Sequence, residues 1–197
     1  MNNRYYAMRH GESTANRQNI IVSHADDALN DYGLTSSGVD QVTQVAIRTR
    51  LRSDTIIISS DFLRARETAT IVQKVIDTKS QVQFFHELRE RSFGNWNLTD
   101  ASNYKKVWDD DLEHPHLSNE NIETTSQVLT RTISVIDQME ANHKQKTILI
   151  VGHGDVLQIL MCHFYGIDVR FHRSLSFIKN AEIRSLPNQI QRNDMTA

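Results

Sequence analysis

The feature that most constrains the fold is a rhythm of five short apolar runs, at residues 5–8, 55–59, 82–85, 147–151 and 181–186. Each run is too short for a typical helix, and long helix-compatible stretches separate them, as in chains built from βαβ units. The run at 147–151 shows no polar alternation, which is typical of a central strand buried on both faces of a parallel sheet. The pattern predicts a three-layer α/β/α fold with a mainly parallel central sheet.

The stretches between the runs carry helix signals. Apolar stripes predict helices at 35–51, 63–76, 128–139 and 154–164. Thr35 is the expected N-cap of the first, and Thr124 with Gln127 forms a capping-box pattern before the third.

Residues 97–122 break this rhythm with Asp109, Asp110, Asp111, His114 and His116. This mixture is too polar for a core, so we expect an excursion over one end of the sheet. No Pro-, Gly- or Ser-rich linker divides the 197 residues, and we predict a single domain over 1–197.

Composition narrows the classes of function. A formal net charge of −2 gives no field that would attract nucleic acid or an anionic membrane surface, so we expect neither as a partner. The one cysteine, Cys162, lies in an apolar run and is expected to be a buried thiol, which together with the lack of a long apolar segment predicts a cytoplasmic protein. Apolar residues such as Ile133 and Val135 fit either the core or an interface, so a homodimer stays open.

Two histidines follow predicted strands. His10 lies in Arg-His-Gly-Glu-Ser at 9–13, after the first strand, and His153 lies in Gly-His-Gly at 152–154, after the strand at 147–151. Because the carboxyl ends of parallel strands meet at one edge of a sheet, both histidines are expected in one crevice. Arg64 opens a predicted helix near the same edge, and helix N-termini and arginines favour anions. The pattern indicates a phosphoryl-binding site.

In these motifs the chain resembles the histidine phosphatases of the phosphoglycerate mutase-like branch, whose signature begins with Arg-His-Gly-Glu-Ser after the first strand. Later blocks match in order and approximate spacing, at residues 60–69, 88–96, 123–131 and 152–154. The resemblance spans nearly the whole chain. It implies a phosphoglycerate mutase-like fold and a phosphoric monoester hydrolase acting on a small phosphorylated substrate, without metal or cofactor.

The resemblance also assigns roles. It implies that His10 is the nucleophile and carries a covalent phosphohistidine, and that the transferred group is surrounded by Arg9, Arg64 and a protonated His153. Neutral His10 would attack through one ring nitrogen while the other donates to a backbone carbonyl near Gly11.

Further residues are implied around this centre. Asn16 matches a phosphate ligand of the family. Glu90 matches the proton donor, because it lies four residues before Gly94 in a Leu-x-Glu context, and Glu87 precedes that context. Ser23 and His24 are weaker candidates, as residues that line the pocket or merely belong to a loop.

Several alternatives remain. A phosphoglycerate mutase shares this chemistry, but the chain is shorter than the cofactor-dependent mutases it resembles, which favours a phosphatase. Asn97 departs from the family, in which Glu-Gly commonly follows the tryptophan, and puts the local loop in question. A non-catalytic phosphate-binding module is disfavoured because no residue of the implied set is missing.

Two groups of residues admit a structural reading. His114 and His116 flank a proline near three aspartates, but their spacing matches no known metal motif, so a solvated loop is favoured. Trp96, Tyr104 and Trp108 fit either a substrate-facing surface or a cap on the sheet edge.

Overall fold

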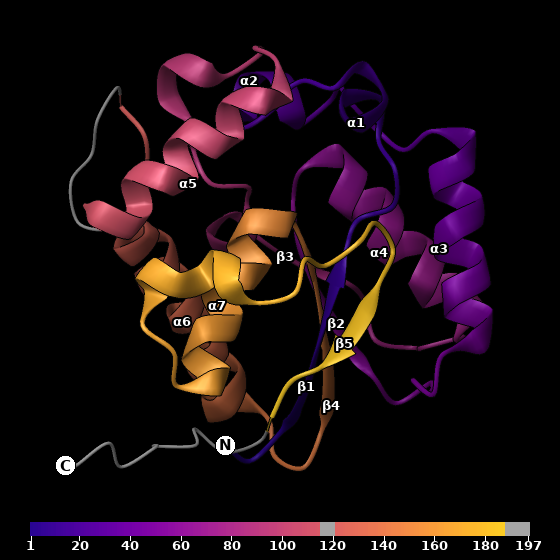
Figure 1. The fold of residues 1–197 in the computed structure, drawn as a ribbon. Helices are drawn as coiled ribbons and strands as arrows, with labels where there is room; N and C mark the ends of the chain where they lie inside the picture. The colour runs from indigo at the N-terminus through magenta and orange to yellow at the C-terminus, as the bar shows by residue number, and fades with distance from the viewer. Residues whose placement is uncertain (115–120, 188–197) are drawn as a thin grey trace, which may run out of the picture.

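A five-stranded sheet forms the centre of the molecule (Figure 1). The computed structural model describes residues 1–114 and 121–187. The strands lie in the order β3-β2-β4-β1-β5, and β5 alone among the described strands runs antiparallel to its neighbour β1. Their bounds are β1 Arg4–Arg9, β2 Ile56–Ser60, β3 Gln83–Phe85, β4 Thr147–Gly152 and β5 Ile183–Ser185. All five predicted strands are confirmed, as is the mainly parallel sheet.

Helices cover both faces of the sheet (Figure 1). α3 (Ser36–Arg48) and α4 (Leu63–Val75) pack on one face, and α6 (Thr125–Asn142) and α7 (Gly154–Tyr165) pack on the other. The central strand β4 supplies both cores, because Ile148 and Ile150 join the α6/α7 side while Leu149 and Val151 join the α3/α4 side. Each such fully buried side chain stabilises the fold by about 2 kcal/mol.

The predicted helix starts are also confirmed. The Thr35 side chain accepts a hydrogen bond from the Gly38 amide at the start of α3, and Thr124 with Gln127 forms the capping box of α6. The shorter elements are α1 Thr14–Gln18, α2 Ala25–Ala28, α5 Tyr104–Glu113, η1 His86–Leu88, η2 Gly94–Trp96, η3 Ala101–Asn103 and η4 Val169–Ser174. α1, α2 and α5 lie at the end of the sheet where the parallel strands finish (Figure 1).

Residues 97–114 are more deeply packed than their composition suggested. Asp111, on α5, is buried, so the expectation that this mixture is too polar for the interior is wrong at that position. Its burial is possible because both carboxylate oxygens accept hydrogen bonds from the Arg91 guanidinium, at 2.6 and 2.7 Å. His114 is exposed, and His116 lies outside the described residues.

Cys162 is a free, fully buried thiol in α7, as predicted. Within residues 1–114 and 121–187, none of the helices has the length and apolar character that crossing a bilayer requires.

Candidate active site

The two histidines of the motifs lie side by side at the carboxyl end of the sheet. β1 pairs with β4 so that Arg9 is opposite Gly152, and the His10 amide donates to the Gly152 carbonyl at 3.0 Å. The ring centroids of His10 and His153 are 5.3 Å apart, and both residues are buried. The parallel register therefore brings the two motifs into one site.

The hydrogen bonds of His10 fix which ring nitrogen is basic. Nδ1 lies 2.7 Å from the Gly11 carbonyl, which only accepts, so Nδ1 carries the proton. Nε2 accepts a hydrogen bond from Arg64 Nε at 3.2 Å. Burial lowers the pKa of His10 well below its usual value, and Arg64 and Arg9 lower it further. The ring is thus neutral, with the Nε2 lone pair directed to the arginine side.

Two arginines surround that nitrogen with partly unused donors. Arg64 is buried and donates through Nη2 to the Val22 carbonyl at 3.0 Å, and Arg9 donates through Nη1 to the Ile178 carbonyl at 3.2 Å. Arg64 Nη1 and Arg9 Nε are buried without a hydrogen-bond partner among the described residues. Buried donors of this kind normally have partners, so these atoms are candidates for hydrogen bonds to an anion.

His153 is held from the other side. Its Nε2 lies 2.9 Å from the Ser60 hydroxyl, and its ring packs against the edge of Phe62 at 5.4 Å between centroids. Nδ1 is buried and lacks a partner in the described parts of the chain. Burial, and after it the charge of Arg64, lower the pKa of His153 well below its usual value. The implied protonation of His153 refers to the site with a phosphoryl group bound, and it stays a prediction.

Glu90 lies beside this cluster and Glu87 does not. Glu90 lines the same cavity as His10, Arg9 and Arg64, whereas the Glu87 side chain pairs with the exposed His86 at 3.2 Å. Burial raises the pKa of Glu90 to about 7, with Asp155 acting in the same direction. A carboxyl with this pKa is suited to donating and accepting a proton near neutral pH.

Of the remaining candidates, Asn16 lies beside His10, whereas Ser23 and His24 lie farther out. Asn16 lines the cavity beside His10, but its Oδ1 accepts from the Ser13 amide and hydroxyl in a capping box, and from Asn180 Nδ2. Ser23 and His24 instead line a wider outer cavity.

Asn97, where the chain departs from the family pattern, holds the outer loop together. Its Oδ1 accepts from the amides of Ser23 and His24, at 2.8 and 3.2 Å, and from the Ser23 hydroxyl. Its Nδ2 donates to Asp27 at 2.7 Å. Asn97 therefore places an amide that fixes residues 23–27 where the family commonly has a glutamate, and Leu98, with a φ of 62°, stands where the family has a glycine.

Of the three aromatic residues singled out in the sequence, two line a cavity and the third packs in a small core. Tyr104 and Trp108 stack at 5.3 Å between centroids and both line an inner cavity that Arg9 and Glu90 also line. Trp96 packs in a small core with Phe93 and carries Lys106 over its ring at 4.8 Å.

Several supporting residues were not identified from the sequence. Thr68 accepts from the Gly11 amide at 3.1 Å and Asn180 donates to the His10 carbonyl at 3.1 Å, so both hold the nucleophile loop. Gly38 approaches that loop so closely that a Cβ would lie 2.0 Å from the Glu12 carbonyl oxygen. For Thr68 alone there was a signal, since it falls in the matched block at 60–69.

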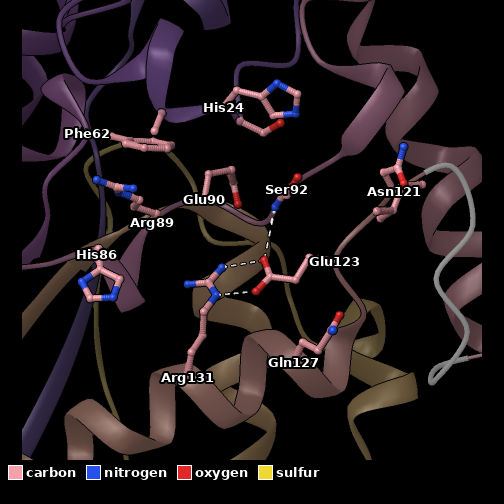
Figure 2. A pocket seen from close by; sticks show the side chains of 13 residues that line it. His24, Phe62, His86, Arg89, Glu90, Ser92, Asn121, Glu123, Gln127 and Arg131 are labelled. Atoms are coloured by element: carbon pink, nitrogen blue, oxygen red, sulfur yellow. Dashed lines mark hydrogen bonds and ion pairs between the residues drawn. The ribbon is translucent and has the colours of Figure 1, made fainter.

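Two larger cavities adjoin the small cavity that Arg9, His10 and Arg64 line. The inner one, of about 210 Å³, shares Arg9, Asn16, Glu90 and Tyr104 with it. The outer one, of about 610 Å³, is lined by Glu90 and Phe62 and has the Arg131–Glu123 ion pair on its wall (Figure 2). Across residues 1–114 and 121–187, no three His, Cys, Asp or Glu side chains are grouped as a metal site would require.

An uncharged histidine that faces two arginines is suited to binding a phosphoryl group and attacking its phosphorus. The chain belongs to the histidine phosphatase superfamily, branch 1, whose family model matches residues 5–195. Its relatives are named phosphatases or mutases, and the chain is a phosphoric monoester hydrolase of this superfamily.

The relatives differ in their substrates. The chain is 30% identical to the adenosylcobalamin/alpha-ribazole phosphatase of Escherichia coli K12, over 83% of this chain and 80% of that protein. It is 27% identical to a probable phosphoglycerate mutase of Erwinia tasmaniensis, over 93% and 84%. It is also 27% identical to a metal-independent phosphoserine phosphatase of Arabidopsis thaliana, over 78% and 65%.

Solved structures share the fold. The alpha-ribazole phosphatase of Shigella flexneri superposes with a TM-score of 0.75 at 26% identity, covering 92% of this chain and 89% of that one. A mycobacterial glucosyl-3-phosphoglycerate phosphatase in complex with VO3 superposes with a TM-score of 0.76 at 21% identity, covering 91% and 90%.

Proposed function

We propose that this protein is a metal-independent phosphatase that hydrolyses a small phosphorylated metabolite through a phosphohistidine on His10. The observation that carries the proposal is the hydrogen bonding of His10: the Gly11 carbonyl holds the proton on Nδ1, which leaves the Nε2 lone pair beside Arg64. A neutral imidazole in this orientation is a nucleophile without prior deprotonation.

In the first step, Nε2 of His10 attacks phosphorus and the bond from phosphorus to the ester oxygen breaks. Arg9 Nε, Arg64 Nη1 and His153 Nδ1 supply the donors for the three non-bridging oxygens. Asn16 lines the same cavity and is a candidate for a further contact with the phosphoryl group. Protonated Glu90 gives its proton to the leaving oxygen, so an alcohol departs.

In the second step, Glu90, now a carboxylate, accepts a proton from water as the water oxygen attacks the phosphohistidine. The bond from phosphorus to Nε2 breaks, and inorganic phosphate leaves. Glu90 thus regains the proton that it gave to the leaving group. The two arginines supply the positive charge that metal ions provide in other phosphatases.

The inner cavity supports a small leaving group, because about 210 Å³ adjoins the phosphoryl site. A mutase is the second candidate, favoured by the likeness to a probable phosphoglycerate mutase. It would need a substrate hydroxyl in place of water in the second step. The single buried Cys162 supports a cytoplasmic location, and a homodimer stays a prediction.

The test is a phosphatase panel of phosphoglycerates, phosphoserine, sugar phosphates and nucleotides, with and without a strong chelator, and with 3-phosphoglycerate also assayed for isomerisation. We expect phosphate release that the chelator leaves unchanged. Recovery of chelator-lost activity by a divalent cation would contradict metal independence, and isomerisation without phosphate release would establish the mutase.

The His10→Ala variant tests the intermediate. It removes the nucleophile from a loop after β1, so we expect a folded protein with turnover lowered by at least about 1000-fold. Acid-quenched wild-type protein should contain phosphohistidine and the variant should not. Near-normal turnover in His10→Ala would rule out the covalent mechanism.

A further inference from the structure

A buried cluster of ion pairs is joined to Glu90 through the next residue, Arg91, and has no role in the chemistry described so far. Arg91 is 1% exposed, and its guanidinium contacts both carboxylate oxygens of Asp111 on α5. The same guanidinium donates to Asp155 at 3.3 Å, and its Nε donates to the Glu123 carbonyl at 2.6 Å. The amide of Arg91 donates to Glu90 Oε1 at 2.9 Å. One residue therefore joins the proton donor to α5 and α7.

Asp155 is the member of the cluster that faces the site. It follows the Gly-His-Gly motif in the first turn of α7, is 4% exposed, and lines the inner cavity together with Glu90. Trp108 donates to its Oδ1 at 2.9 Å, and His172 Nε2 lies 3.2 Å from the same oxygen. Burial alone would raise the pKa of Asp155, but His172, Arg91 and Arg173 hold it well below its usual range. Asp155 is therefore expected to be ionised at neutral pH.

We propose that Asp155 is a positioning residue for the proton donor: its fixed carboxylate places a second negative charge beside Glu90 and so favours the protonated form of Glu90 that the leaving group needs. This inference rests on the proposed function of Glu90 as the acid. Two carboxyl groups near each other in a buried site do not both ionise readily, so the one with more cationic partners ionises first. Asp155 has those partners and Glu90 has fewer.

The surroundings of Glu90 agree with this division. The charged or titratable groups that line a cavity together with Glu90 lie on two sides of it. On the inner side they are Arg9, His10, Arg64, Tyr104, Asp155 and Arg173, and on the outer side they are His24, His86, Arg89, Glu123 and Arg131. Of these, Arg64 and Arg9 lower the pKa of Glu90 while burial and Asp155 raise it. A dianionic phosphoryl group would neutralise the two arginines and leave the effect of Asp155 in place.

The test is the pH profile of kcat/KM in the full chain, for an alkyl phosphomonoester turned over in the panel. In Asp155→Asn we expect the basic limb to move about one pH unit lower, because Glu90 loses the neighbouring charge and ionises earlier. The profile for p-nitrophenyl phosphate should change much less, since that leaving group needs little protonation. A purely structural role would lower both activities together without moving the limb.

Asp111→Asn is the matched control. It removes an equal charge from the same Arg91 cluster, but Asp111 is not among the groups that act most strongly on Glu90. It should lower stability and leave the limb in place. A folded Asp155→Asn with an unmoved limb would overturn the inference, as would an equal shift in Asp111→Asn.

A second measurement covers the case in which Asp155→Asn does not fold. Infrared difference titration of the wild-type protein against Glu90→Gln reports the protonated carboxyl of Glu90 directly. We expect its band to persist to near neutral pH, and a midpoint at the usual value for glutamate would overturn the inference. If the loss of kcat in Glu90→Gln does not depend on the basicity of the leaving group, Glu90 is not the acid. That failure of the proposed function is distinguishable from a failure of the inference about Asp155.

Discussion

At the scale of single residues, the site depends on where protons lie. His10 and His153 are neutral because burial and two arginines lower the pKa of both rings, while the pKa of Glu90 is raised to about 7. The attacking nitrogen of His10, Nε2, is thus free of a proton under the conditions in which Glu90 retains one. This opposite perturbation of neighbouring groups is how a single site carries out nucleophilic attack and proton donation at one pH.

The choice between Glu90 and Glu87 gives a residue-scale prediction. Glu90→Gln keeps the size of the side chain but removes its transferable proton, so we expect kcat to fall about 100-fold or more for alkyl esters and much less for an aryl ester. Glu87→Gln is the control, because its side chain pairs with exposed His86 away from the cluster. The measurement is kcat across esters of increasing leaving-group basicity. A steeper dependence in Glu87→Gln than in Glu90→Gln would reverse the assignment.

Much of the residue-level placement follows from local sequence. His10, Arg64, Glu90 and His153 each follow a strand end, and the parallel register makes strand ends meet. Asp155 was not identified, because its partners come from segments far away in the chain. The burial of Asp111 was missed for the same reason, since a run of aspartates shows nothing of a guanidinium twenty residues earlier.

At the scale of elements, the start of α3 holds the nucleophile loop. Gly38 packs against the Glu12 carbonyl, and Thr35 donates to both the carbonyl and the carboxylate of Glu12. Helix capping by Thr35 could be predicted from sequence. The backbone contact could not, because nothing local distinguishes a glycine that is needed for close approach from one that is merely tolerated in a helix.

Gly38→Ala tests that contact, because helix propensity and the close approach predict opposite changes in the free energy of unfolding. Helix propensity alone predicts a gain of about 1 kcal/mol for this change. The close approach predicts instead a loss of about 3 kcal/mol in the free energy of unfolding, together with lower activity as the loop of His10 shifts. Denaturant unfolding and kcat/KM measure both effects. Ser37→Ala, at the exposed neighbouring position, should change little, and a Gly38→Ala variant as stable as that control would contradict the packing argument.

At the scale of the whole molecule, the five strands and four main helices were predictable because each has its own apolar period. The antiparallel direction of β5 was not specified by the sequence, since a strand of three residues with mixed burial has no pattern that fixes direction. The position of α5 at the mouth of the site also depends on tertiary contacts, through Trp108 to Asp155 and Asp111 to Arg91.

Because His10 and His153 are neutral, we expect the binding of phosphate to be coupled to the uptake of protons from solvent. A dianion entering between Arg9 and Arg64 should raise the pKa of His153 and of Glu90 together, so protons from solvent become co-ligands of phosphate. Calorimetric titration with inorganic phosphate, in buffers of different ionisation enthalpy, should show a heat that depends on the buffer and corresponds to net proton uptake near pH 7. Binding heats that are the same in every buffer would contradict this. If protons are taken up, the site binds phosphate and hydrogen ions jointly, and its affinity for phosphate depends on pH.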